Sequence, residues 1–296
     1  MKRLVLLGGG HAHVEVLRSL AADPGARPEV TVVTPFPRLI YTGMVPGVIA
    51  GHYRLDECAI GIEALAQRAG ATFVQTRASL VNPGARDVMC ADGGVIPYDV
   101  LSIDVGSQPA IGMARGVEQH AVVIRPLENL MKGWGGVLAR TRAGGVSSIS
   151  IVGGGAAGVE LALAMDHRLR VERGDAAPHV RVITDTPVPV AEFSDGARRR
   201  LRRHLAKRNI GMHVSSTVVE VGHDHVRLDT GLEFASDATF WAAGAGAQPW
   251  IRESGFATDP RGFLLTNDRL QSVTYREVFG AGDCATLEGV PLAKAG

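Results

Sequence analysis

The stretch from Ile149 to Ala162, ISIVGGGAAGVELA, decides the fold. A short apolar run typical of a buried parallel strand leads into three glycines, and apolar residues at helical spacing follow. Gly153, Gly155 and Gly158 complete the pattern G-x-G-x-x-G. The first glycine allows a tight turn, the second lets a pyrophosphate approach the backbone, and the third lets helix and strand pack closely. The stretch therefore predicts a phosphate site at a helix N-terminus.

The same unit occurs near the start of the chain, from Leu4 to Leu17, as LVLLGGGHAHVEVL. This copy keeps Gly8 and Gly10, but His13 stands where the third glycine belongs. Its helix must then lie further from its strand, or the imidazole must find room at the edge. A second strand is expected after each copy, at residues 29–34 and 180–184. The sequence therefore predicts a duplicated βαβ unit.

The acid that normally receives the ribose hydroxyls at the end of the second strand is missing from both copies. The first copy offers Thr34, and the second offers Thr184 followed by Asp185. Asp185 favours NAD over NADP because it would repel a 2′-phosphate. A basic run at residues 198–203 lies beyond it, so NADH and NADPH both stay open; we expect this run to form a solvated helix after an N-cap at Ser194.

Composition excludes several classes of function. The 296 residues suggest two domains, and 31 Lys and Arg against 30 Asp and Glu give a net charge of +1, so we expect no nucleic-acid partner. Cys58, Cys90 and Cys284 form no C-x-x-C pair, which argues against a disulfide framework and a zinc site. The alternate spacing of His11 and His13 is typical of packed imidazoles or of imidazoles that face a bound cofactor, and we expect no metal. Without a signal peptide or membrane-spanning run, a cytoplasmic chain is expected.

A third signature, VFGAGDCA, runs from Val278 to Ala285. Together with the segments at 103–109 and 241–249, it resembles the flavoproteins with two dinucleotide-binding domains, the glutathione reductase-like group. The resemblance implies FAD, with Asp283 on its ribityl chain and a helix opening after it, and NAD(H) or NADP(H) as co-substrate. It also implies an α/β fold of two Rossmann-like, glutathione reductase-type domains, one inserted in the other.

The resemblance also sets expected boundaries. Residues 1–115 and 245–296 would form a discontinuous FAD-binding domain, and residues 116–244 an NAD(P)-binding domain. The chain stops at residues 292–296, where relatives begin a C-terminal interface region, so we expect that region to be missing. The FAD-binding domain would have lost the segment that covers the flavin ring and often mediates dimerisation or membrane docking in relatives.

Segments 8–14 and 37–53 look most like the type II NADH dehydrogenase-like flavoproteins associated with selenide, water dikinase. This similarity implies a small-molecule electron acceptor, with a quinone-like molecule among the candidates. A homodimer, a selenide, water dikinase partner and a cytoplasmic or membrane-peripheral location through the missing C-terminal region are further expectations. The alternative is a non-catalytic flavin- or nucleotide-binding module that serves a selenium-metabolism partner.

Cysteine positions narrow the chemistry. The segment 41–46 that resembles a single-cysteine position in relatives reads YTGMVP, without a sulfur nucleophile. This argues against a disulfide reductase, and against a sulfide:quinone oxidoreductase because residues 92–282 contain no cysteine. Flavin-only electron transfer remains, from NAD(P)H through FAD to an acceptor. Glu160 is the predicted catalytic residue, in an orienting or proton-handling role; its alternative is a solvated acid that complements the helix dipole.

The remaining candidates are residues expected to contact a cofactor, either from a fingerprint or from the resemblance. They are Gly8, Gly10, His11, Ala12, Thr34, Arg38, Met44, Pro46, Gly106, Gly153, Gly155, Gly158, Asp185, Gly244, Gly282 and Asp283.

Overall fold

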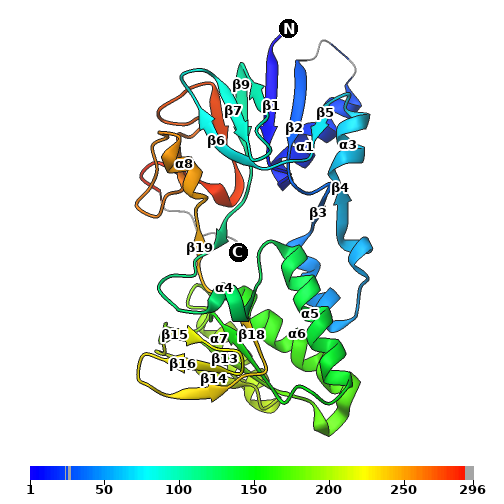
Figure 1. Cartoon of the computed structure of the whole chain (residues 1–296), viewed down its shortest axis with the longest axis vertical. Helices are drawn as coiled ribbons and strands as arrows, with labels where there is room; N and C mark the ends of the chain where they lie inside the picture. The colour runs from blue at the N-terminus through cyan, green and yellow to red at the C-terminus, as the bar shows by residue number, and fades with distance from the viewer. Residues whose placement is uncertain (24, 26–27, 291–296) are drawn as a thin grey trace. The chain divides into compact units, whose positions relative to one another are not determined.

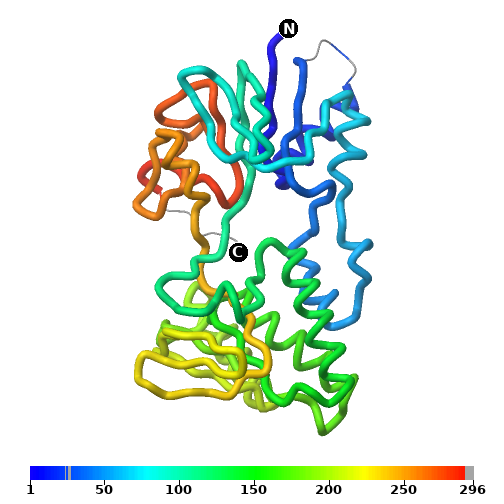
Figure 2. Tube along the Cα trace, viewed as in Figure 1, coloured from blue at the N-terminus to red at the C-terminus, as the bar shows by residue number. Residues whose placement is uncertain are grey.

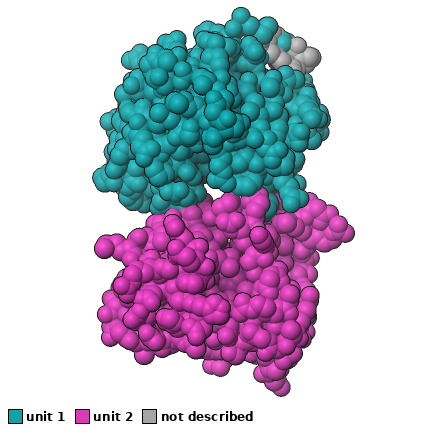
Figure 3. Space-filling view, in the orientation of Figure 1, with its two compact units in different colours: residues 1–41, 59–108, 245–296 teal, residues 42–58, 109–244 magenta. Residues whose placement is uncertain are grey.

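The computed structural model describes residues 1–23, 25 and 28–290, and the chain divides into two compact units (Figure 3). Unit 1 comprises Met1–Tyr41, Ala59–Gln108 and Ala245–Gly296, and unit 2 comprises Thr42–Cys58 and Pro109–Gly244. The predicted boundaries put residues 42–58 and 109–115 in the first domain, whereas these residues cluster with unit 2. Residues 292–296, on which the prediction of a missing C-terminal region depends, lie outside the described residues.

Unit 1 is built on a parallel sheet (Figure 1). Its strand order is β21 (Val278–Gly280), β9 (Val100–Ile103), β1 (Arg3–Leu7), β2 (Glu29–Val33) and β5 (Thr72–Val74). Alternate residues of β1 enter different clusters, since Val5 packs in one and Leu6 in the other. The second cluster is closed by α1 (His11–Ala22) and α3 (Ile62–Arg68), which contribute Leu17 and Ala66. Because successive side chains of a strand point to opposite faces of the sheet, this buried strand contributes to two cores.

Smaller sheets complete unit 1. One is antiparallel, from β6 (Ala78–Asn82), β7 (Asp87–Cys90) and β8 (Val95–Pro97), and β3 (Arg38–Ile40) pairs with β4 (Ala59–Gly61). A short helix, α8 (Pro249–Glu253), places Ile251 in the first cluster.

Within the residues that the structure describes, the helix expected to open after Asp283 is not found. Gly282–Cys284 form a single 3-10 turn, η4, and the chain continues directly into a strand, β22 (Ala285–Leu287). β22 pairs in parallel with β20 (Leu264–Thr266). This pairing satisfies the backbone hydrogen bonds that a helix would otherwise have made, so the prediction of a helix at this point was wrong.

Unit 2 repeats the arrangement (Figures 1 and 2). The order of its parallel sheet is β11 (Ala121–Val123), β18 (Ala238–Trp241), β12 (Ser148–Val152), β13 (His179–Ile183) and β14 (Gly211–His213). Its helices are α4 (Val117–His120), α5 (Leu127–Arg142), α6 (Ala156–Arg173) and α7 (Asp195–Lys207), with a 3-10 turn η3 (Gly174–Ala176). The predicted N-cap of α7 is present, because Ser194 Oγ accepts a hydrogen bond from the Ala197 N–H.

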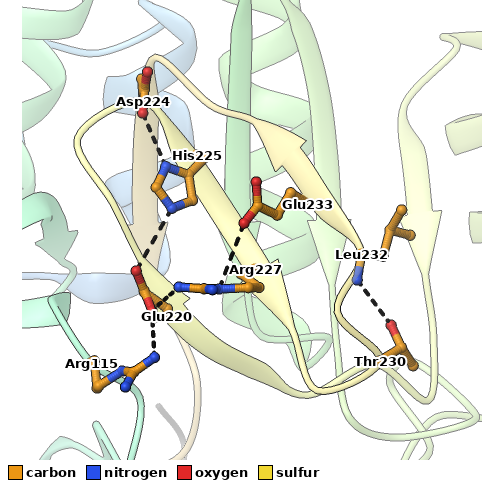
Figure 4. A network of polar contacts seen from close by, with 8 residues as sticks. All are labelled: Arg115, Glu220, Asp224, His225, Arg227, Thr230, Leu232 and Glu233. Atoms are coloured by element: carbon orange, nitrogen blue, oxygen red, sulfur yellow. Dashed lines mark hydrogen bonds and ion pairs between the residues drawn. The ribbon is translucent and has the colours of Figure 1, made fainter.

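Two further parts belong to unit 2. The first runs through η1 (Thr42–Met44), α2 (Val45–Ala50) and η2 (Leu55–Cys58), and α2 packs against α6. The second is an antiparallel sheet of β15 (Val218–Val221), β16 (His225–Leu228) and β17 (Glu233–Ala235). On this sheet the Glu220 carboxylate is approached by Arg115, Arg227 and His225 (Figure 4). Hydrogen bonds from Arg115 and Arg227 lower the pKa of Glu220.

Short strands β10 (Gln108–Pro109) and β19 (Ala245–Gly246) mark where the chain passes from one unit to the other. The predicted α/β fold with parallel sheets is confirmed, and each copy of the repeated sequence forms a strand, a glycine turn and a helix.

Candidate functional site

The glycine turn of unit 2 combines crowded and open positions. A side chain at Gly153, where φ is +127°, would lie 2.6 Å from the Ala242 carbonyl oxygen, and one at Gly158 would lie 2.0 Å from that of Gly153. Gly155 has an ordinary extended backbone, and a Cβ there would meet no described atom within 4 Å. Gly153 and Gly158 are therefore required for packing, while Gly155 leaves an open approach to the backbone.

Gly155 is also the N-cap of α6, and no side chain caps this end. The first N–H groups of a helix have no partner within the helix, and the helix dipole makes this end attractive to anions. An open glycine at an uncapped helix start is the geometry that accepts a pyrophosphate.

Thr184 stands at the end of β13, where the ribose acid would be. It is buried, a Cβ at Gly154 would lie 2.7 Å from its Cβ, and its hydroxyl contacts that of Thr186 at 3.0 Å. Asp185, the next residue, is exposed. The threonine thus packs under the turn.

The other predicted residues of unit 2 are spread over several elements. Glu160 is exposed on α6, and Gly244 has φ +58° at the end of the segment after β18. Met44 lies in η1 and Pro46 in the first turn of α2. Met44 and Pro46, both expected to contact a cofactor, therefore belong to unit 2, whereas the first fingerprint belongs to unit 1.

The glycine turn of unit 1 is closed by one residue, Asp104, which follows β9. A Cβ at Gly8, where φ is +102°, would lie 2.2 Å from the Asp104 carbonyl oxygen. A Cβ at Gly10 would lie 2.2 Å from the Asp104 carboxyl carbon, and one at Gly282 would lie 2.5 Å from Asp104 Oδ1. The carboxylate thus has the first fingerprint on one side and the Gly-Asp signature on the other.

His13 fills the space of the missing third glycine. The imidazole is 1% exposed, with Nδ1 2.7 Å from the Gly8 carbonyl oxygen and Nε2 2.9 Å from Ser102 Oγ. Burial lowers the pKa of His13. The imidazole is therefore packed inside the strand–helix contact, and it has both ring nitrogens satisfied.

Asp104 is a functional candidate to which the sequence reasoning assigned no role. Its Oδ2 accepts a hydrogen bond of 3.0 Å from the Ala12 N–H at the start of α1, and the residue is 5% exposed. Burial raises its pKa, while hydrogen bonds from the backbone N–H groups of Ala12 and His13 oppose this effect. Aligning the two copies beyond their fingerprints would have revealed it, because Ala242 stands at the corresponding place in unit 2.

The remaining predicted residues of unit 1 lie around this turn or on nearby elements. A Cβ at Gly9 would lie 3.4 Å from Oγ1 of the buried Thr34. His11 is exposed with its ring edge-on to Tyr41, and Arg38 is exposed on β3. Gly106 has φ +68° and open space beside it. Asp283 is half-buried in η4.

All three cysteines are buried thiols outside any disulfide. Burial raises the pKa of the Cys58 and Cys90 thiols, which keeps them protonated. Cys284 Sγ lies 3.1 Å from the Ala281 carbonyl oxygen and 3.4 Å from that of Ile103, inside the unit 1 core. None of the three therefore has the environment of a reactive thiolate.

Among the residues that the structure describes, no three His, Cys, Asp or Glu side chains come together as metal ligands. Within the same residues, no helix combines the length and apolar character needed to cross a bilayer.

Known proteins resemble this chain in sequence and in fold. It is 24% identical to a probable NADH dehydrogenase from Dictyostelium discoideum, over 97% of this chain and 68% of the relative. It is 21% identical to a type II NADH:quinone oxidoreductase from Staphylococcus saprophyticus, over 97% and 75%. The solved structure of NDH2 from Plasmodium falciparum in complex with NADH superimposes with a TM-score of 0.84 at 16% identity, over 97% and 65%.

One family model covers almost the whole chain. The model described as pyridine nucleotide-disulphide oxidoreductase matches residues 2–295. The matched region contains both glycine turns and the Gly-Asp signature. The chain therefore belongs to the pyridine nucleotide-disulphide oxidoreductase family.

Proposed function

We propose that this chain is an FAD-dependent NAD(P)H dehydrogenase that passes electrons to a quinone-like acceptor without a redox disulfide. The observation that carries the proposal is the pair of glycine turns at the starts of α1 and α6, each at the carboxyl end of a parallel strand. Relatives named NADH dehydrogenase and NADH:quinone oxidoreductase match along nearly the full chain. The donor is accordingly a nicotinamide dinucleotide.

The residues present fit two dinucleotides. The open space at Gly155 and the uncapped N-terminus of α6 suit the pyrophosphate of NAD(P)H in unit 2. In unit 1 the turn at Gly8 and Gly10 and the signature that begins at Gly282 meet around Asp104, and this arrangement suits FAD. FAD, when bound, supplies the two-electron acceptor for hydride.

The chain's own residues then bind, orient and exclude water. Asp283 would hold the ribityl chain, and Glu160 would orient the bound groups or handle a proton. The other proposed contacts in unit 1 are Gly8, Gly10, His11, Ala12, Thr34, Arg38, Gly106 and Gly282, and in unit 2 they are Met44, Pro46, Gly153, Gly155, Gly158, Asp185 and Gly244. The buried, protonated thiols support electron transfer by flavin alone.

Finer assignments rest on the resemblance of segments 8–14 and 37–53 to selenide, water dikinase-associated flavoproteins. We propose selenide, water dikinase as a partner, a homodimer, and a cytoplasmic or membrane-peripheral location. Co-purification of tagged chain with selenide, water dikinase, read by mass spectrometry and light scattering, tests the first two. Recovery of neither complex from freshly lysed cells would contradict them.

The decisive test of the activity is reduction of the bound flavin. Purified protein loaded with FAD is mixed anaerobically with NADH, and separately with NADPH, while flavin absorbance is followed. Bleaching, followed by recovery of the absorbance when a soluble quinone is added, supports the dehydrogenase. A loaded flavin that neither donor bleaches would contradict it, and the alternative of a non-catalytic module would then stand.

A further inference from the structure

The two repeats differ at three positions that touch one another in unit 1. Gly158, Phe240 and Ala242 of unit 2 are replaced by His13, Ser102 and Asp104. The sheet registers establish the equivalence, because Leu6 pairs with Ser102 in the first unit as Ile151 pairs with Phe240 in the second. Three apolar residues in one copy are thus replaced by a polar cluster in the other.

The hydrogen bonds of His13 determine which of its ring nitrogens carries the hydrogen. The Gly8 carbonyl oxygen can only accept, so His13 Nδ1 carries a hydrogen, and a neutral Nε2 accepts from the Ser102 hydroxyl. Burial lowers the pKa of His13, so the neutral form persists at neutral pH. His13 therefore offers Asp104 no full positive charge to pair with.

Asp104 lies where phosphates are expected. Its carboxylate accepts the Ala12 N–H at the start of α1 and lies within contact distance of the Cβ positions of Gly10 and Gly282. The ionisable side chains that face it are His11 and His13 of α1, and Asp283 follows Gly282 on η4. An ionised, 5% exposed carboxylate would repel a pyrophosphate and compete for the same helix N-terminus.

We propose that Asp104 serves the FAD pyrophosphate as a protonated carboxyl that donates a hydrogen bond, so that FAD binding takes up one proton from solvent. The proposal rests on the assignment of FAD to unit 1. Protonation removes the repulsion and turns a competing acceptor into a donor. Burial, which raises the pKa of Asp104, acts in the same direction. Unit 2, with Ala242 at this position, binds its dinucleotide without such a proton.

The test measures FAD binding rather than turnover. FAD is titrated into protein stripped of flavin between about pH 5.5 and 8.5, with flavin fluorescence giving the affinity. Calorimetry in buffers of different ionisation enthalpy gives the proton count. Above the pKa of Asp104 in the flavin-free protein, wild type should take up about one proton per FAD, and its affinity should fall by up to about tenfold per pH unit.

Three variants distinguish a proton on Asp104 from other causes of pH-dependent FAD binding. Asp104→Asn keeps a neutral donor, so binding should lose its proton uptake and stay tight at high pH. Asp104→Ala should also lose the pH dependence but bind more weakly than Asp104→Asn. Asp99→Asn is the matched control, because Asp99 lies just before β9, paired with Arg3, and should leave the wild-type pH dependence intact.

Several outcomes would overturn the proposal. They are an FAD affinity of wild-type protein that does not change with pH, an unchanged proton count in Asp104→Asn, and binding that requires Mg²⁺ and is lost with EDTA. Absence of FAD binding by every variant at every pH would remove FAD from unit 1 altogether. A loaded flavin that NAD(P)H cannot reduce is a different failure, which strikes the dehydrogenase and leaves this proposal standing.

Discussion

At the scale of single residues, the glycine turn at the start of α6 contains glycines that folding requires and one glycine that nucleotide binding requires. Gly158 lies against the Gly153 carbonyl oxygen, so no larger residue fits without backbone movement. Gly155 has an ordinary extended backbone with open space beside it. Substitution of Gly158 should therefore lower stability, whereas substitution of Gly155 should lower nucleotide affinity and leave stability nearly unchanged.

Gly155→Ala should leave the melting temperature nearly unchanged while weakening NADH binding, because the added methyl occupies the approach to the pyrophosphate. Gly158→Ala should destabilise the protein by about 1–3 kcal/mol or more through overpacking. Thermal melts and NADH titrations read both effects. Gly196→Ala on α7, also with open space, is the control and should be neutral or slightly stabilising. Equal loss of stability in the 155 and 158 variants would contradict this account of the turn.

Asp283→Ala should lower FAD retention through purification and leave folding largely intact, because the side chain is half-buried in the short turn η4. The flavin-to-protein absorbance ratio and a circular dichroism melt measure the two properties. Unchanged flavin loading would remove Asp283 from the site.

At this scale both glycine turns could be predicted from the sequence. Asp104, which lies between the first turn and the Gly-Asp signature, could not. The missing third glycine was visible, and the sequence offered either a more distant helix or an imidazole at the edge. The structure places His13 inside the contact, hydrogen-bonded to Gly8 and Ser102. Ser102 and Asp104 lie about 90 positions further along the chain, so their meeting with α1 follows from strand pairing and not from local pattern.

At the scale of elements, α5 and α6 are joined by a shared carboxylate. Glu172 of α6 pairs with Arg142 of α5 at 2.7 Å and with Arg168 of its own helix at 2.8 Å. These partners lower the pKa of Glu172 to about 2. Since the folded pKa lies below the ordinary value of 4.5, the stabilisation is present above that pH and is lost as the pH falls toward 2.

Glu172→Gln should therefore melt below wild type at pH 7, and the difference should shrink between about pH 4.5 and 2 as the wild-type carboxylate is protonated. Thermal melts across this range measure it, with Glu118→Gln, an exposed glutamate of α4, as the control. A difference that stays constant down to pH 2 would show that the ion pairs are not its cause.

Elements set by local pattern were predictable, and those set by distant partners were not. Strands β1, β2, β12 and β13 follow from buried apolar runs, and the start of α7 follows from Ser194. β22 replaces an expected helix because β20 provides a pairing edge. Residues 42–58 join unit 2 because α2 packs on α6, where a Cβ at Gly51 would lie 2.0 Å from Arg168 Nη1.

At the scale of the whole molecule, one chain carries two copies of a parallel sheet with a glycine turn. The surroundings of the two turns differ. Unit 2 keeps an open turn with Gly155 and Ala242, whereas unit 1 closes its turn with Asp104 and His13. The two turns would differ in this way if the units bind two different dinucleotides rather than two of the same kind.

The most direct test of this account is anaerobic addition of NADH to FAD-loaded protein, with NADPH in parallel. We predict stoichiometric bleaching of the flavin by at least one donor, and loss of bleaching at low donor concentration in Gly155→Ala while its flavin stays loaded. A fully loaded flavin that neither NADH nor NADPH reduces would contradict the central claim.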